Sequence, residues 1–208
     1  VRKKNVVNTM MTSIFIIGVG IVMWVLFGYS LSFAPSGNAF IGDFRWLGLE
    51  GVSLTEGYTD DASIPNMVFS AFQMMFAVIT PALITGAVAG RMKFKSIFVF
   101  TIFWSLIVYY PLAHMVWGQG GLLGADGIGA LDFAGGDVVH ISSGVSALVL
   151  CILLGKRHDY EHSIYRIHNI PTVVLGASLL MFGWFGFNAG SALAADGLAA
   201  HAFMTTGV

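Results

Sequence analysis

The segment from Ala130 to Gly144 reads Ala-Leu-Asp-Phe-Ala-Gly-Gly-Asp-Val-Val-His-Ile-Ser-Ser-Gly, with two acidic residues ahead of an apolar run that contains a histidine. If the segment is helical, the step from Asp132 to His140 rises ~12 Å, which carries His140 toward the middle of a bilayer ~30 Å thick. An ionisable side chain at that depth is costly to keep, so His140 is a candidate functional residue. The rest of the sequence has to distinguish a histidine that lines a pore from one that packs in a core.

The composition is typical of a membrane protein. Hydrophobic residues make up 56% of the 208 residues, charged residues make up 10%, and the mean hydropathy is +0.80. Soluble domains carry about twice that charged fraction. The net charge of -1 gives no reason to expect a nucleic-acid partner. The single cysteine, Cys151, cannot form an internal disulfide and lies in an apolar run, so we interpret it as a packing residue.

Apolar segments long enough to cross a bilayer alternate with polar loops, which predicts an all-α, polytopic membrane helix bundle. We expect residues 1–208 to form a single transmembrane domain that is truncated at both ends, because the sequence lacks an initiator methionine and stops shortly after an apolar segment begins. The expected spans are approximately 14–31, 64–89, 96–115, 133–154 and 170–187, with the start of a further span after Ser191.

The loop charges alternate along the chain. One set of loops holds nearly all the basic residues, and the other set holds most of the acidic residues with Arg45 as its one basic residue. The basic set comprises Arg2, Lys3, Lys4, Arg91, Lys93, Lys95, Lys156, Arg157 and Arg166. By the positive-inside rule the basic loops are cytoplasmic. This orientation predicts a multi-pass protein of the cytoplasmic membrane whose chain start is cytoplasmic and whose Asp132 lies at the outer end of its span.

Aromatic side chains gather near the outer ends of these spans. Phe72 and Phe76 lie one helical turn apart on one face, Trp117 ends the third span, and Phe187 lies near the end of the fifth. Rings gathered around a vestibule form a cation–π site for a small cation. The alternative is ordinary packing between helices, for which phenylalanine at this spacing is common. Ser191 lies at the same end, and its hydroxyl can accept a hydrogen bond from an N–H donor.

Asp132 and His140 each have a structural and a functional interpretation. Asp132 can cap a helix by accepting hydrogen bonds from backbone N–H groups, and it can equally order the carbonyls of residues 134–136 beside a cation site. A buried, neutral His140 presents one donor and one acceptor nitrogen, so it can hydrogen-bond a small polar solute or simply be satisfied by a neighbouring hydroxyl or carbonyl.

The remaining histidines carry less functional weight. His114 adjoins the end of a span, and we expect it to be interfacial. His158 and His162 form a His-x-x-x-His pair in a basic loop, and without further ligands we do not expect a metal site there. The sequence contains no phosphate-binding loop, zinc-hydrolase motif or nucleophile elbow, so we expect neither an enzyme nor a cofactor.

Four longer motifs follow one another along nearly the whole chain: AFQMMFAVITP at Ala71–Pro81, AHMVWG at Ala113–Gly118, ALDFAGGDVVH at Ala130–His140 and GWFGFNAGSA at Gly183–Ala192. Together they resemble the ammonium transporter (Amt/Mep/Rh) family, and specifically its Amt branch. The resemblance implies an eleven-span subunit built from two inverted five-helix repeats and assembled as a homotrimer. On that plan, this chain corresponds to about helices two to six and the start of helix seven.

The resemblance also implies roles for particular residues. An outer ammonium-binding site would consist of Phe72, Phe76, Trp117 and Ser191, with Asp132 as the acid required for transport. Phe76 and Phe187 would be the stacked rings that close the pore beneath this site. His140 would be the first of a pair of pore histidines, whose partner belongs to a helix outside this chain.

By the same resemblance, the expected activity is transport of ammonium or ammonia, with methylammonium as a related substrate. Ammonium would be recruited on the rings and deprotonated, and ammonia would then pass through an apolar pore beside His140. Cytosolic PII-type regulators would dock on the inner face. Two alternatives stay open: an Amt-like ammonium sensor coupled to a cytoplasmic signalling domain, and an Rh-like channel for a neutral gas.

Overall fold

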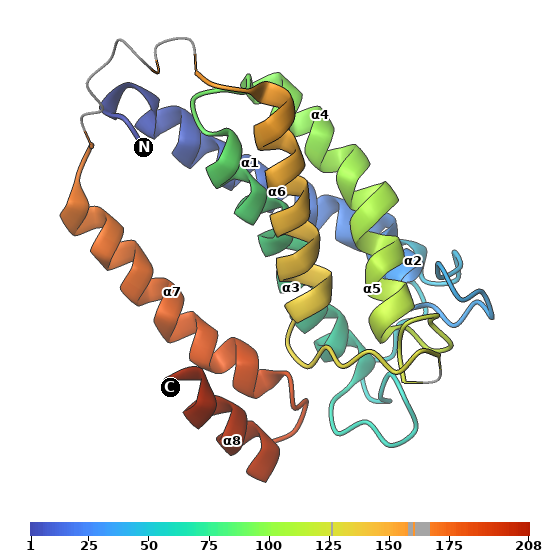
Figure 1. The fold of residues 1–208 in the computed structure, drawn as a ribbon. Coiled ribbons are helices and arrows are strands. Elements are labelled where there is room, and N and C mark those ends of the chain that lie inside the picture. Colours follow the sequence, from blue (N-terminus) through green and yellow to red (C-terminus); the bar gives the residue numbers. More distant parts are fainter. Residues whose placement is uncertain (126, 158–159, 161–166) are drawn as a thin grey trace.

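The computed structural model describes residues 1–125, 127–157, 160 and 167–208 (Figure 1). Within these ranges the regular structure is helical, and strand-like pairing is limited to two isolated bridges. The predicted all-α helix bundle is therefore confirmed. In the described ranges, five helical stretches are long and apolar enough to cross a membrane: Lys3–Phe33, Asn66–Val88, Phe94–Trp117, Gly136–Leu154 and Ile170–Gly190.

The first membrane helix begins earlier than the sequence predicted. It runs through α1 (Val6–Met23), a π-helical turn η2 (Trp24–Gly28) and α2 (Tyr29–Phe33), whereas we expected a start near Ile14. The polar residues before Ile14 do not break the helix, because their hydroxyls bond to carbonyls of the preceding turn: Thr9 to Asn5 at 2.9 Å and Thr12 to Asn8 at 2.7 Å.

The other spans differ from their expected bounds by a few residues. The second is α3 (Asn66–Val88), which continues through Pro81, and the third joins α4 (Phe94–Trp104), the π-helical turn η4 (Ser105–Tyr109) and α5 (Tyr110–Trp117). The fourth consists of η5 (Gly136–Ile141) and α6 (Ser142–Leu154). The fifth is α7 (Ile170–Gly190), and α8 (Gly197–Thr206) follows after Asp196, whose side chain accepts the N–H of Ala199 at 2.9 Å.

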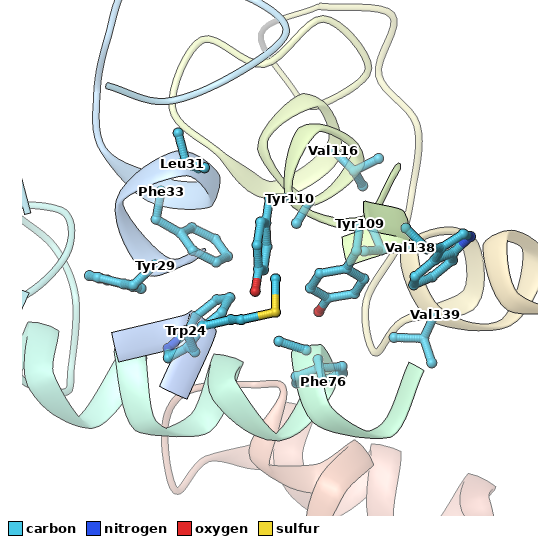
Figure 2. Packing of buried hydrophobic residues seen from close by; sticks show 14 of the residues in the cluster. Trp24, Tyr29, Leu31, Phe33, Phe76, Tyr109, Tyr110, Val116, Val138 and Val139 are labelled. Atoms are coloured by element: carbon cyan, nitrogen blue, oxygen red, sulfur yellow. The ribbon is translucent and has the colours of Figure 1, made fainter. Parts of the chain in front are cut away.

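One aromatic core holds the first four spans together. The ring clusters in Figure 2 bring Trp24 and Tyr29 from the first span against Tyr109 and Tyr110 from the third, and Phe76 of α3 lies at the edge of this cluster. Trp24, Tyr109, Tyr110 and Phe76 are each 1% exposed, and Tyr29 is fully buried. Burial of large rings at this density fixes α3 firmly against α1, α5 and η5.

The last two helices are placed differently. In α7 no residue is buried, whereas every preceding span has a buried face. Figure 1 shows α7 beside the bundle with α8 folded back along its C-terminal part. The ring of Phe185 on α7 packs on Phe203 of α8 with centroids 4.8 Å apart. The C-terminal end of α7 is thus the part that meets both α8 and the bundle.

Basic residues lie at one end of the bundle. The chain start and the turn between α3 and α4 meet there, and the guanidinium of Arg91 donates to the carbonyl of Gly155 at 2.9 Å and to the carbonyl of Ala87 (Figure 1). One arginine therefore satisfies terminal carbonyls of both α3 and α6. The loops that contain Asp43, Asp60 and Asp132 lie at the opposite end, which we call the Asp132 end. Arg166 of the predicted basic set lies outside the described residues.

Candidate functional site

Asp132 organises the start of the fourth span. One carboxylate oxygen accepts the backbone N–H groups of Gly135 at 2.6 Å and Gly136 at 2.8 Å, and the other accepts those of Asp137 at 2.8 Å and Val138 at 2.9 Å. The four unpaired donors at the helix start are thus satisfied by a single side chain. The predicted cap is thus observed, and a role for Asp132 beside a cation site stays a prediction.

Gly135 makes this loop possible. Its φ is +95°, in the left-handed region, and a Cβ atom built on it would lie 2.8 Å from Cγ2 of Val139. Its carbonyl accepts the N–H of His140 at 3.0 Å, which is a bond between residues five apart and opens the wide turn η5. The sequence Gly-Gly after the acid thus sets the position from which His140 projects.

Four aromatic rings from three helices meet next to this loop. The centroid of Phe76 lies 4.0 Å from that of Phe187, 5.1 Å from that of Phe72 and 5.3 Å from that of Trp117. Phe72 and Phe187 are 5.9 Å apart. The structure therefore brings together the rings of α3, α5 and α7 that the sequence predicted for a single site.

Trp117 links this ring cluster to Asp132. Its indole N–H donates to the backbone carbonyl of Asp132 at 2.9 Å, and its ring packs edge-on to Phe76. The hydrogen bond leaves the face of the indole free of polar partners, and the negative face of an aromatic ring is the part that attracts a cation.

Ser191 lies at the end of α7, directly after the ring cluster. Its hydroxyl donates to the carbonyl of Phe187 at 3.1 Å, which leaves the oxygen lone pairs available to an N–H donor. A Cβ atom at the preceding residue, Gly190, would come within 3.3 Å of the Phe72 ring. The small residue therefore allows the end of α7 to approach Phe72 closely.

Beneath the rings lies an apolar cavity of about 370 Å³. Its walls come from α3, η5 and α7, and His140 and Trp184 supply its polar atoms. The lining consists of Met75, Ile79, Leu83, Val139, His140, Leu179, Leu180, Gly183, Trp184 and Phe187. Phe187 belongs to both the ring cluster and the cavity wall, so the cavity begins directly under the rings.

His140 lines this cavity. On one side Trp184 of α7 stacks on its ring, with centroids 5.5 Å apart and planes inclined by 19°. We assigned no role to Trp184. It lies one turn before Phe187, and this helical spacing is the signal that both side chains share a face.

His114 is the clearest difference from our expectation. We predicted an interfacial histidine, but the side chain is 0% exposed. Its Nδ1 lies 3.0 Å from the carbonyl oxygen of Ser32, and its Nε2 lies 2.8 Å from that of Asn38. The two carbonyls belong to α2 and to the loop that follows it, both distant in sequence, so the residues around His114 do not predict the contact.

Within the described part of the chain, no three His, Cys, Asp or Glu residues cluster as metal ligands would. The pair His158 and His162 lies outside the described residues.

Comparison with known proteins shows which family has a similar sequence. A sequence model described as "Ammonium Transporter Family" matches residues 1–208. The ammonium transporter of Bacillus subtilis (strain 168) is 52% identical over 99% of this chain and 49% of its own length. That of Aquifex aeolicus (strain VF5) is 45% identical over 100% of this chain and 47% of its own length. The chain thus spans about half the length of the curated relatives that it matches.

Solved structures of proteins with similar sequences have the same fold. Mep2 of Saccharomyces cerevisiae has a TM-score of 0.82 with 36% identity, over 96% of this chain and 45% of that chain. A structure described as "Sensor Amt Protein" has a TM-score of 0.70 with 32% identity, over 94% of this chain and 47% of that chain. The fold, the order of the spans and the sequence all point the same way.

Proposed function

Because this chain belongs to the ammonium transporter family, we propose that it forms part of a protein that moves ammonium nitrogen across the cytoplasmic membrane. The family is one of membrane transporters and channels, not enzymes. The observation that carries the proposal is the contact of Asp132, Trp117 and Phe76 above an apolar cavity. These residues supply a site for a small cation directly above a space suited to a neutral molecule.

Recruitment of the cation is the first step. The rings of Phe72, Phe76 and Trp117, with the hydroxyl of Ser191, offer π faces and one acceptor oxygen to an ammonium ion. An ion held within ~6 Å of such ring centroids gains roughly 0.5–2 kcal/mol per ring. The carboxylate of Asp132 adds negative potential from behind Trp117, although its oxygens are occupied by backbone N–H groups. This arrangement offsets the loss of the ion's hydration.

Passage through the rings is the second step. Phe76 and Phe187 approach to 4.0 Å between centroids, so a solute can pass between these two rings only when one of them moves. Below them the walls are apolar, and a bare charge in such surroundings is far more costly than a neutral solute. We therefore propose that ammonium gives up its proton near these rings and enters the cavity as ammonia.

His140 is the residue that meets ammonia inside the cavity. Its imidazole offers one donor and one acceptor, which matches a small solute that both donates and accepts hydrogen bonds. Stacking on Trp184 restricts the ring to one plane. The partner histidine that the family resemblance implies would lie on a helix outside this chain.

Orientation and assembly complete the proposal. By the positive-inside rule the basic end of the bundle is cytoplasmic, so the chain start is cytoplasmic and the ring cluster faces outward. We propose a homotrimer, with cytosolic PII-type regulators docking at the basic end. Methylammonium is the natural test substrate, because its charge and size are close to those of ammonium.

The test uses the full-length protein in liposomes. An inward ammonium gradient should drive a current, or a change in internal pH that is faster than the change in empty liposomes. His140→Ala should change the size or ion selectivity of this flux while the protein inserts normally. Absence of flux from the unmodified protein would overturn the proposed function, and an unchanged flux in His140→Ala would show that His140 is only a packing residue.

A sensor is the second candidate, and the similarity to the solved structure described as "Sensor Amt Protein" favours it. A sensor would bind ammonium with the same rings but conduct little of it. Calorimetric binding of ammonium without flux in the liposome assay would support the sensor. Flux of a neutral gas without any effect of ammonium would instead support an Rh-like channel.

A further inference from the structure

The buried side chain of His114 contacts two carbonyl groups from opposite directions. Nδ1 faces the carbonyl of Ser32 in the last turn of α2, and Nε2 faces the carbonyl of Asn38 in the following loop. Carbonyl oxygens only accept hydrogen bonds, so the ring nitrogen that carries the proton donates to the carbonyl that it faces. The other ring nitrogen lies against the second carbonyl, so the imidazole is packed between two backbone segments.

The loop held by His114 is joined to the rest of the Asp132 end. Within residues 34–42, the N–H of Gly42 donates to the carbonyl of Leu31 at 2.7 Å, and the carbonyl of Ala39 accepts the N–H of Leu122 at 2.9 Å. The second bond reaches the glycine-rich segment that follows Trp117. His114 thus lies under a loop that connects α2 to the segment after α5.

The backbone after α5 passes directly over His114. A Cβ atom at Gly118 would lie 2.6 Å from Nδ1 of His114, and one at Gly121 would lie 2.3 Å from its carbonyl oxygen. The N–H of Gly118 also donates to that carbonyl at 2.9 Å. The backbone at Gly118 and Gly121 therefore packs so closely on His114 that neither glycine has room for a side chain.

Trp117 ends the same turn, between His114 and Gly118. On its other side it is held by the bond to the carbonyl of Asp132 and by the packing of Phe76. We infer that His114 is a positioning residue for ammonium recruitment: its two carbonyl contacts hold the last turn of α5 so that the Trp117 ring stays beside Phe76. The inference rests on the proposed function, because the role of Trp117 comes from there.

The test is a comparison of apparent KM and maximal rate for methylammonium uptake by the full-length protein, with each rate divided by the amount of inserted protein. His114→Phe keeps an aromatic ring but removes both ring nitrogens. We expect it to raise KM about fivefold to tenfold, because a buried carbonyl is left unsatisfied and the turn shifts. His114→Gln keeps an amide NH2 donor group and should give an intermediate KM. The maximal rate per inserted molecule should change less than KM.

Thr101→Val is the matched control. Thr101 is 3% exposed in the same membrane span, but its hydroxyl donates only to the carbonyl of Ile97 in its own helix at 2.9 Å. We expect this variant to keep the KM of the unmodified protein.

The outcomes separate the inference from the proposed function. If both His114 variants insert and keep the KM of the unmodified protein, His114 is not a positioning residue. If His114→Phe fails to insert, His114→Gln decides, because an unchanged KM in that variant overturns the inference as well. If the unmodified protein takes up no methylammonium, the proposed function has failed instead.

Discussion

The indole N–H of Trp117 donates to the backbone carbonyl of Asp132 over 2.9 Å, so the last residue of α5 is bonded to the residue that caps η5. Asp132 takes part twice, through its carbonyl toward Trp117 and through its carboxylate toward residues 135–138. The ring that is proposed to meet the cation and the helix that carries His140 therefore depend on the same residue. A substitution of Asp132 is therefore expected to disturb both the Trp117 ring and the helix that carries His140.

Replacing Asp132 by asparagine should abolish methylammonium uptake by the full-length protein. The amide has one acceptor oxygen in place of two, so part of the four N–H groups loses its partner, at a cost of about 1–3 kcal/mol for each buried donor. Uptake and trimer formation are measured side by side, and the trimer should persist. Asp137→Asn is the control, because it keeps the backbone N–H that bonds to Asp132. Normal uptake by Asp132→Asn would remove Asp132 from the site.

Substitutions of Trp117 should separate its ring from its hydrogen bond. Trp117→Phe keeps an aromatic face but loses the N–H, and Trp117→Leu loses both. If the ring contributes about 0.5–2 kcal/mol to cation binding, Trp117→Leu raises KM by roughly twofold to thirtyfold, with Trp117→Phe in between. Uptake curves for methylammonium give the order. Equal KM values for all three proteins would contradict a cation–π role.

The two rings that meet at 4.0 Å should differ in their effect on stability. Phe76 is 1% exposed and belongs to the aromatic core, so Phe76→Ala should destabilise the protein by about 3–5 kcal/mol. Phe187 is only partly buried, and Phe187→Ala should cost less. Thermal unfolding of the full-length protein in detergent compares them. A lower melting temperature for Phe187→Ala would show that the core boundary drawn through Phe76 is wrong.

Two glycines in one span provide a matched pair. Gly135 has φ +95° and no room for a Cβ atom, so Gly135→Ala should lower both thermal stability and uptake. Gly144 lies in α6 with nothing within 4 Å of a Cβ atom, and Gly144→Ala should be neutral or stabilise the helix by up to ~1 kcal/mol. The same melting and uptake assays apply. Equal effects of the two substitutions would argue that the left-handed turn is dispensable.

Hydropathy and motif spacing predict much of this arrangement. Uniformly apolar segments of sufficient length leave few alternatives to membrane helices, and the helical spacing of Phe72 and Phe76 already places them on one face. The helix that contains the first span extends before Ile14, into residues that are typical of loops by composition. The hydroxyls of Thr9 and Thr12 bond to carbonyls of the preceding turn, which allows these polar residues to continue the helix.

The details of the site depend on contacts between distant segments. His114 is buried because the backbone carbonyls of Ser32 and Asn38 lie against it. Contacts of this kind involve no side chain of the partner, so the residue types at those positions do not predict them. His140 meets Trp184 because α7 lies beside η5 in space, although the two are far apart in the sequence. Asp132 was recognised as a cap or a cation-site residue, and the left-handed turn at Gly135 brings the four N–H groups to its carboxylate.

The wide turn Gly136–Ile141 also fixes the rotational phase of the fourth span. A turn closed over five residues holds one residue more than a regular helical turn, and each residue of a regular helix advances the chain by roughly 100°. The extra residue is absorbed inside the wide turn, so the helix after it keeps the phase that a regular helix with one residue fewer would have. If the same sequence were wound as a regular helix throughout, α6 would be rotated by about 100° and a different face would pack on α3.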